Sequence, residues 1–208
     1  MRDEEIEKLA MSLYDPKLPY HNFEHIRTVL KEAEIIVGKC RAEGIDIDDR
    51  VVYYALLFHD AGYHEDHGRK GYDSKEAYSA ALAERELAGN GFAQDMINKV
   101  KTAIMGTHCD GHCLSNEDKV VRAADLSGLT ADYKVFKENT INLKREFEMM
   151  SGTTLTWQEW INNAVNRIEL FLREDLDLTS DYYDEEGNSI FHRHARENLK
   201  TLMSDNSD

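Results

Sequence analysis

Proline is scarce in this sequence. The two prolines, Pro16 and Pro19, both lie near the amino terminus, so no proline-rich linker or low-complexity hinge divides the remaining chain. A chain of 208 residues is long enough to bury a substantial core without cross-links. We therefore expect residues 1–208 to form a single domain.

Cysteines and long apolar runs are scarce as well. Three cysteines are too few, and odd in number, for a disulfide framework, which favours a reducing compartment. No run of about 18 uninterrupted apolar residues is present, and the first five residues lack the basic region and apolar core of a secretory signal. These features predict a cytoplasmic protein that does not act at a membrane.

Basic residues are outnumbered by acidic ones. The 25 lysines and arginines stand against 40 aspartates and glutamates, a formal net charge of −15. Such a charge repels polyanions over about a Debye length, roughly 8 Å in physiological salt, so we expect no nucleic acid polymer as a partner. A small phosphorylated substrate is still compatible with this charge, because a bound divalent cation reverses the field locally.

The apolar residues recur at spacings of three and four, and sustained alternation with a period of two is absent. This pattern predicts an all-α fold, a bundle of eight or nine helices. Asp73 and Glu76 have the spacing of an N-cap and its N3 partner, and His59 and Asp60 fall in the last turn of the third helix. The expected helices run at about residues 6–13, 22–43, 48–62, 73–87, 93–105, 117–127, 131–150, 157–173 and 184–203.

Imidazoles and carboxylates interrupt apolar helical segments at three places. His21 and His25 are four residues apart near the start of the second helix and therefore share a face. His59 and Asp60 follow an apolar run, and Asp125 lies in another. An unpaired buried carboxylate costs several kcal/mol, whereas coordination to a cation satisfies it. These positions therefore suggest a metal site.

The residue types also restrict the metal. Imidazole nitrogens together with carboxylate oxygens suit Mn, Fe, Co, Ni, Zn or Mg rather than Ca. Two histidines and two aspartates leave coordination positions open for water and substrate, which is typical of a catalytic site.

The order His25, His59 and Asp60, then Asp125, each on an expected helix, resembles the HD-domain metal-dependent phosphohydrolase superfamily. The resemblance spans about residues 18–203 and implies an HD-domain-like helical bundle that hydrolyses phosphate esters or anhydrides. It implies that these four residues ligate one divalent ion, with a second ion left open. Further segments look like one bacterial branch of this superfamily: Tyr20 to His25, Phe58 to Asp60, Tyr63, Glu76 with Ser79 and Ala80, Thr107 with His108, Asp125 with Leu126, and Ala195 to Leu199.

Two positions depart from the pattern of that branch. Lys75 stands where an asparagine is usual before the glutamate, and Ala123 stands where an acidic residue is often seen. These departures bear on the substrate and not on the metal site.

The resemblance also suggests which residues transfer protons. His21 matches the position that, in related cyclic-nucleotide phosphodiesterases, donates a proton to the leaving oxygen, and an imidazole suits that work. Alternatively, it only hydrogen-bonds a neighbour or a phosphate. Glu65, Asp66 and Glu76 are candidates for orienting or deprotonating the attacking water. Each could equally be a solvated charge, and Glu76 could be the capping partner of Asp73.

Candidates for substrate binding are His108, Lys70, Arg145 and Arg196, because phosphate needs cationic contacts. The alternative for the cations is a surface ion pair worth under about 1 kcal/mol. His108 could also ligate a second ion, or join Cys109, His112 and Cys113 in a structural zinc site.

An apolar stripe with aromatic members occupies the helix expected at 157–173. Such a stripe could stack a base, but at helical spacing it is more often core, and we interpret it as core. Its members are Trp157, Trp160, Ile161, Val165, Ile168 and Phe171.

These features together predict a metal-dependent phosphohydrolase that acts on a small phosphorylated compound, a nucleotide above all, and they leave a homodimer open. Two alternatives remain: a metal-containing nucleotide-sensing or binding module without turnover, and a metalloprotein whose ion is purely structural. Substrate identity does not follow from the ligand pattern.

Overall fold

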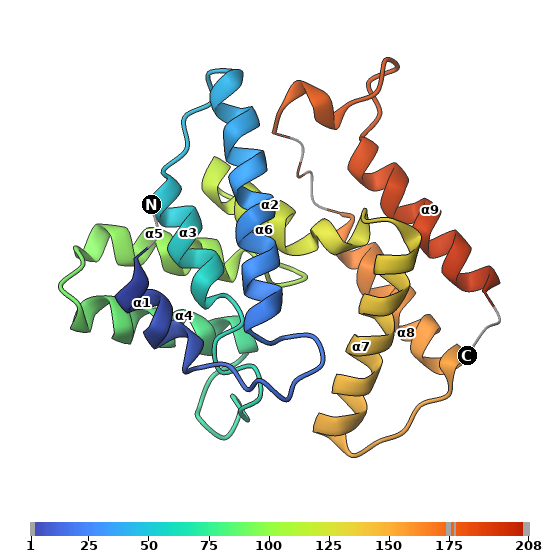
Figure 1. Ribbon diagram of the computed structural model, residues 1–208, viewed down its shortest axis with the longest axis horizontal. Helices are drawn as coiled ribbons and strands as arrows, with labels where there is room; N and C mark the ends of the chain where they lie inside the picture. Colours follow the sequence, from blue (N-terminus) through green and yellow to red (C-terminus); the bar gives the residue numbers. More distant parts are fainter. Residues whose placement is uncertain (1–2, 174–175, 177, 206–208) are drawn as a thin grey trace.

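Helices form the framework of the protein, as the spacing of apolar residues predicts. The computed structural model describes residues 3–173, 176 and 178–205, and within these ranges it contains nine α-helices, two 3-10 turns and no sheet (Figure 1). The all-α expectation is therefore confirmed. The elements are α1 (Glu4–Met11), α2 (Phe23–Ala42), α3 (Asp49–Phe58), α4 (Lys75–Gly89), α5 (Gln94–Met105), α6 (Asn116–Asp125), η1 (Leu126–Leu129), α7 (Tyr133–Ser151), α8 (Trp157–Phe171), η2 (Ser180–Tyr182) and α9 (Ile190–Ser204).

The third helix lies at the centre of the core. Seven of its ten residues are buried, because it is apolar on almost every face and packs against α2, α4, α5 and α6. The polar residues that follow it directly are thereby held inside the protein. This placement puts His59 at 2% exposure.

The helices fall into two groups that are visible in Figure 1. Helices α1 to α6 surround α3, and α7, α8 and α9 pack on one another beside them. The 3-10 turn η1 continues directly from α6 and contacts both α7 and α9. The group from α1 to α6 and the group from α7 to α9 therefore meet close to Asp125, the last residue of α6.

The boundaries of α3 and α4 differ from the prediction in ways that affect named residues. Helix α3 ends at Phe58, and His59 is its C-cap, so the two polar residues follow the helix instead of occupying its last turn. Helix α4 is capped by Ser74, whose side chain accepts the N–H of Ala77. The assignment of Asp73 and Glu76 as a capping pair is therefore wrong.

The start of α9 is also later than expected. Asp184 does not open the helix, because its carboxylate accepts the backbone N–H groups of Glu186 and Asn188 and closes a turn. Ser189 is the N-cap, and its side chain accepts the N–H of His192.

The apolar stripe of α8 is core, as we interpreted it. Ile161 and Ile168 are buried, and Trp157 packs against the same cluster. Trp160 donates its indole N–H to the carbonyl of Thr140 on α7 at 3.1 Å. The residues of the stripe therefore pack between helices and do not form a surface for stacking a base.

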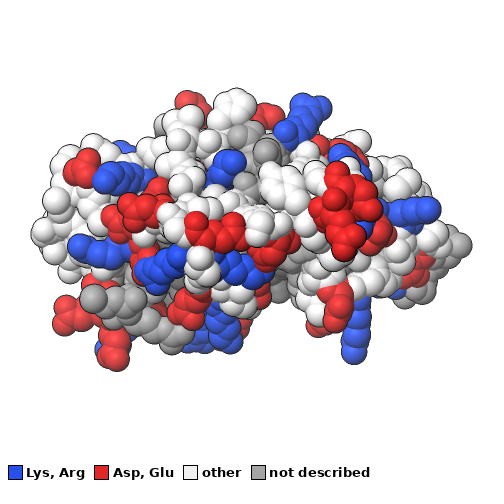
Figure 2. All heavy atoms as spheres, turned by 90° about the horizontal axis from the view of Figure 1, so that it is seen from above, with Lys and Arg blue, Asp and Glu red and all other residues white. Residues whose placement is uncertain are grey.

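Charges of both signs are interspersed on the face in Figure 2, where the densest cluster of one sign is acidic. No helix among the described residues combines the length and the apolar character needed to cross a bilayer.

Candidate metal centre

Four side chains, from α2, α6 and the segment directly after α3, converge beside the end of α3. His25 lies in the first turn of α2, where the Asn22 side chain caps the backbone N–H groups of Glu24 and His25. His59 and Asp60 follow α3, and Asp125 ends α6. One ligand atom from each of these four residues, two imidazole nitrogens and two carboxylate oxygens, lies within 4.8 Å of the others. This cluster could hold a metal ion.

The distances between these atoms are short. Nε2 of His59 lies 3.0 Å from Oδ2 of Asp60 and 3.2 Å from Oδ1 of Asp125. Nε2 of His25 lies 3.3 Å from the same Asp125 oxygen and 3.6 Å from Oδ2 of Asp60. Ligands about 2.1 Å from a common ion, at tetrahedral or octahedral angles, are about 3.0–3.4 Å apart. Three of these four distances lie within that range and the fourth, 3.6 Å, lies just above it, so the cluster is close to the size that one transition-metal or magnesium ion needs.

One buried oxygen supports this fit independently. Oδ2 of Asp60 is buried and makes no hydrogen bond with acceptable geometry to any described residue, although His59 Nε2 lies near it. A buried carboxylate oxygen without a hydrogen bond is costly, and a cation would satisfy it. The donor set, two nitrogens and two oxygens, suits Mn, Fe, Co, Ni, Zn or Mg.

A hydrogen bond to the backbone fixes the orientation of the His59 ring. Its Nδ1 lies 2.8 Å from the carbonyl oxygen of Leu56, and only a protonated Nδ1 can donate to a carbonyl. Nε2 is therefore the nitrogen that carries the lone pair when the ring is neutral, as a metal ligand must be, and it points at the two aspartates. Metal-binding histidines are typically held by such a contact.

The electrostatics of the four residues are tightly linked. Burial alone would lower the pKa of His59, but Asp60 and Asp125 raise it well above its ordinary value. Burial alone would raise the pKa of Asp60, but His59 and His21 lower it to about 2, and the pKa of Asp125 is lowered by His59 and His25 in the same way. The two aspartates are thus anionic at neutral pH, as ligands for a cation must be.

A tight turn after Asp60 keeps the ligands in place. Gly62 has a φ of +72°, and a Cβ there would lie 2.6 Å from a ring carbon of Tyr78, so only glycine fits. The N–H of Gly62 donates to the carbonyl of Leu13, and the carbonyl of Ala61 accepts the hydroxyl of Ser79 on α4. Contacts from α4 and from the segment after α1 therefore fix this turn.

His21 lies beside the cluster, with its ring centre 6.0 Å from that of His25. Its position depends on Glu146 of α7, a carboxylate that is only 2% exposed. One oxygen of Glu146 accepts the backbone N–H groups of Tyr20 and His21 at 3.0 and 2.8 Å. The other is in close contact with Nδ1 of His21, which leaves Nε2 as the ring nitrogen available for chemistry.

Glu146 was not among the residues predicted from the sequence, and no local signal could have found it, because its partners lie 125 and 126 residues away. Burial alone would raise the pKa of this carboxyl, but the hydrogen bonds from His21 and Tyr20 lower it. Glu146 therefore holds a negative charge behind the His21 imidazole.

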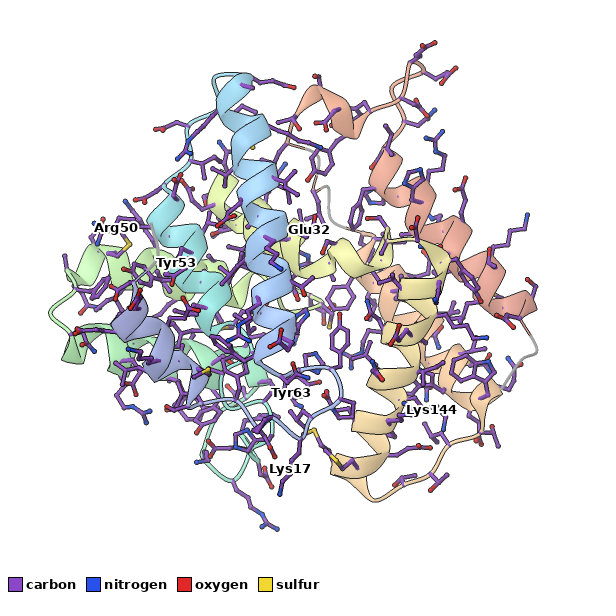
Figure 3. The ribbon with its side chains drawn as sticks, viewed as in Figure 1. Lys17, Glu32, Arg50, Tyr53, Tyr63 and Lys144 are labelled. Atoms are coloured by element: carbon purple, nitrogen blue, oxygen red, sulfur yellow. The ribbon has the colours of Figure 1, made fainter. Side chains whose placement is uncertain are left out.

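Tyr63 and Lys75 extend the site on the other side of His21. The Tyr63 ring stacks on the His21 ring with centres 3.7 Å apart and planes 15° apart, and Figure 3 labels Tyr63 near the start of α2, on the side of α7. Nζ of Lys75 lies 3.2 Å from the centre of the same Tyr63 ring. Because two groups this close cannot share one face, His21 and Lys75 cover opposite faces of Tyr63.

The three acidic residues predicted to handle water lie in different settings. Glu65 pairs closely with Lys70, and Asp66 pairs with Arg69 at 3.2 Å on the surface. Glu76 lies in the first turn of α4 and makes no hydrogen bond or ion pair with another described residue. Of the three, only Glu76 has an uncommitted carboxylate.

The predicted substrate-binding cations are dispersed. Lys70 is committed to Glu65, and Arg145 is an exposed residue of α7 next to Glu146. Arg196 lies 3.9 Å from Glu169 and lines a hollow of about 600 Å³ along α9. None of the four clustered ligands lines that hollow.

His108 belongs to a second, smaller cluster. Its ligand atom converges with those of Cys109 and Asp110, and this group does not include His112 or Cys113. The set of two histidines and two cysteines proposed for zinc is therefore not the set that converges.

The segment around His108 is organised by a buried arginine of α6. Arg122 is 1% exposed, and its guanidinium donates to the carbonyls of Gly106, His108 and Gly111 at 2.7, 2.9 and 2.9 Å. The Arg122 guanidinium thus supplies hydrogen-bond donors to the backbone carbonyls of residues 106–111, in place of the backbone N–H groups that a helix would supply.

Comparison of this sequence with protein-family models found no match, and comparison with curated proteins found none either. What the chain does is therefore inferred from its own side chains.

Proposed function

We propose that this protein is a metal-dependent hydrolase of small phosphorylated compounds, nucleotides above all, with the HD-domain arrangement of ligands. The observation that carries the proposal is the convergence of His25, His59, Asp60 and Asp125 beside His21. Two imidazoles and two carboxylates leave positions on an ion open to water and substrate, which favours catalysis over a purely structural role. When bound, a divalent ion supplies Lewis acidity that activates water and offsets phosphoryl charge.

The residues of the chain have distinct roles in this proposal. His25, His59, Asp60 and Asp125 hold the ion, and the contact of His59 with Leu56 keeps its Nε2 aimed inward. Phosphoryl transfer needs a positioned nucleophile and charge stabilisation more than covalent catalysis by the protein. The activated water would take one of the positions that the four ligands leave open on a bound ion.

Proton transfer in this proposal belongs to His21. Glu146 is held against its Nδ1, so that Nε2 is the atom that donates a proton to the leaving oxygen. The stacked Tyr63 ring limits rotation of the imidazole. Glu76, whose carboxylate has no partner among the described residues, is available to orient the attacking water.

The test is a metal-reconstitution assay. The protein is stripped with a chelator, reloaded separately with Mn, Co or Ni, and assayed against p-nitrophenyl phosphate, bis(p-nitrophenyl) phosphate, cyclic nucleotides and nucleoside mono-, di- and triphosphates. We expect hydrolysis that is lost on chelation and restored by metal. Asp60→Asn should reduce it to the level of the stripped protein. Asp95→Asn should not, because Asp95 is an exposed residue of α5 that pairs with Lys99 on the surface.

Other outcomes would favour the alternatives. Tight nucleotide binding by metal-loaded protein without turnover over hours, unchanged in His21→Ala, would identify a sensing or binding module. An ion coordinated only by protein atoms in X-ray absorption spectra, with no turnover, would identify a structural metal.

A further inference from the structure

Lys75 is in an unusual setting for a lysine of so acidic a protein. It is partly buried at the start of α4, its Nζ lies over the Tyr63 ring, and it also donates to the Tyr63 carbonyl at 3.4 Å. Asp60, Glu146 and Glu76 act on it electrostatically, yet none of them lies within the 4.0 Å of an ion pair. A cation drawn partly out of water without a carboxylate partner is costly unless an anion compensates it.

A second cation, Arg167 of α8, lies within electrostatic range of Tyr63 and Lys75. Arg167 is exposed and makes no ion pair with another described residue. It is close enough to oppose the rise in the pKa of Tyr63 and to add to the effect of burial in lowering the pKa of Lys75. Arg167 therefore lies within electrostatic range of Lys75, as do the carboxylates of Asp60, Glu146 and Glu76.

Several other lysines and arginines of the chain form ion pairs with carboxylates. Lys70, close in sequence to Lys75, is paired with Glu65, and Lys144 of α7 is paired with Glu148 at 2.6 Å. On α4 itself, Arg85 is paired with Glu86 at 2.6 Å. Lys75 and Arg167, by contrast, form no ion pair with a carboxylate of the described residues, although Asp60, Glu146 and Glu76 act on Lys75 from a longer distance.

We propose that Lys75 and Arg167 bind a second anionic group of the substrate, beyond the phosphate that lies against His21. The proposal rests on the phosphohydrolase function proposed above and gives it a substrate class, compounds that carry two or more linked phosphates. The Tyr63 ring separates the Lys75 ammonium from the His21 imidazole. One phosphate at the metal and His21 would therefore leave the two cations to a neighbouring phosphate, with which charge-assisted hydrogen bonds form.

The test compares substrates with one phosphate and with several. With Mn-loaded protein, kcat/KM is measured for a nucleoside monophosphate and for the matching di- and triphosphates in Lys75→Gln, Lys75→Arg and Arg167→Gln. We expect Lys75→Gln and Arg167→Gln to lower kcat/KM for the di- and triphosphates about tenfold or more, as the loss of a charged hydrogen bond would. The monophosphate should change less than about twofold, and Lys75→Arg should retain most of the activity, since a charged donor remains.

Arg85→Gln and Lys99→Gln are matched controls, because both residues are exposed and paired with carboxylates on their own helices. Equal losses on mono- and diphosphates, or no loss on either, would overturn the inference. Arg167 is exposed, so its variant folds even if Lys75→Gln does not.

The outcome remains decisive if the protein hydrolyses none of these compounds, a result that would refute the proposed function alone. Calorimetric titration of metal-loaded protein with inorganic pyrophosphate and with orthophosphate then tests the two cations by themselves. Weaker pyrophosphate binding in Arg167→Gln, with orthophosphate binding unchanged, supports the inference. Unchanged pyrophosphate binding overturns it.

Discussion

Replacing Glu146 with glutamine tests whether α7 positions His21. The carboxylate accepts two backbone N–H groups and contacts Nδ1 of His21 while almost completely buried. A hydrogen bond to a charged group contributes about 1.5–3 kcal/mol and a neutral one about 0.5–1.5 kcal/mol. A loss of about 1 kcal/mol at each of the three contacts gives a destabilisation of about 3 kcal/mol, or about 6–12 °C in Tm for a chain of this size.

The same substitution should affect catalysis. A glutamine can place its oxygen toward the two backbone N–H groups, but its amide NH2 then faces Nδ1 of His21 and prevents that nitrogen from being protonated. We expect kcat to fall about 100-fold, the lower range for the loss of general acid catalysis, with little change in KM. The basic limb of the pH profile should also move, because a general acid acts only while it is protonated, and a purely structural role would not cause that movement.

The assay combines urea unfolding with steady-state kinetics on the best substrate of the reconstitution screen. Glu138→Gln is the control, because Glu138 is an exposed residue of the same helix. If Glu146→Gln matched the unmodified protein in both urea midpoint and kcat, the role assigned to Glu146 would be wrong.

The stability difference also has a predicted pH dependence. The pKa of Glu146 is lowered in the folded protein from an ordinary value of 4.5, so its carboxylate stabilises the fold above about pH 4.5. That contribution is lost as the pH falls through the folded-state pKa. The difference in unfolding free energy between the unmodified protein and Glu146→Gln should therefore shrink below pH 4.5, and a constant difference would contradict the assignment.

Three further substitutions have defined outcomes. Asp60→Asn should lower the metal content of purified protein measured by elemental analysis, and retention of a full equivalent would contradict the ligand assignment. Arg122→Leu leaves the carbonyls of residues 106–111 without their donor and should reduce the free energy of unfolding in urea by about 3 kcal/mol or more; a change under 1 kcal/mol would refute its role. Gly62→Ala should cost about 2–4 kcal/mol, from the positive φ and the clash together. Gly71→Ala, also at positive φ but with nothing within 4 Å of the added Cβ, should cost only about 1 kcal/mol.

Helix existence was predictable because it depends on local spacing. An apolar face repeats every three or four residues whatever it packs against, so α5 and α8 could be located from their own residues. Boundaries were less predictable, since several polar side chains compete for the same backbone N–H groups. Ser74 displaced Asp73 as the cap of α4, and Asp184 closes a turn instead of opening α9.

The residues of the candidate site also divide into those that the sequence predicted and those that it did not. His59, Asp60 and Asp125 were predictable as candidates because each follows or interrupts an apolar helical segment. The choice of His25 over His21, and the complete set of four, depended on the resemblance to the HD-domain superfamily. Glu146 and Arg167 were not predicted, because their importance comes from contacts across more than a hundred residues or from charges on another helix. Lys75 was noted only as a departure from a pattern, and its position over Tyr63 required the fold.

The division of the protein into the group α1 to α6 and the group α7 to α9 has a consequence for how its substrate selectivity could be altered. Every residue of the four-ligand cluster comes from α2, α3 or α6 and the residues directly after α3, while Glu146 and Arg167 come from α7 and α8. Under the proposed function, mutations in α7 and α8 would change which reactant is accepted while the four candidate ligands stay in place. Randomising residues of α7 and α8, with the four candidate ligands unchanged, would therefore be the way to seek a new substrate selectivity.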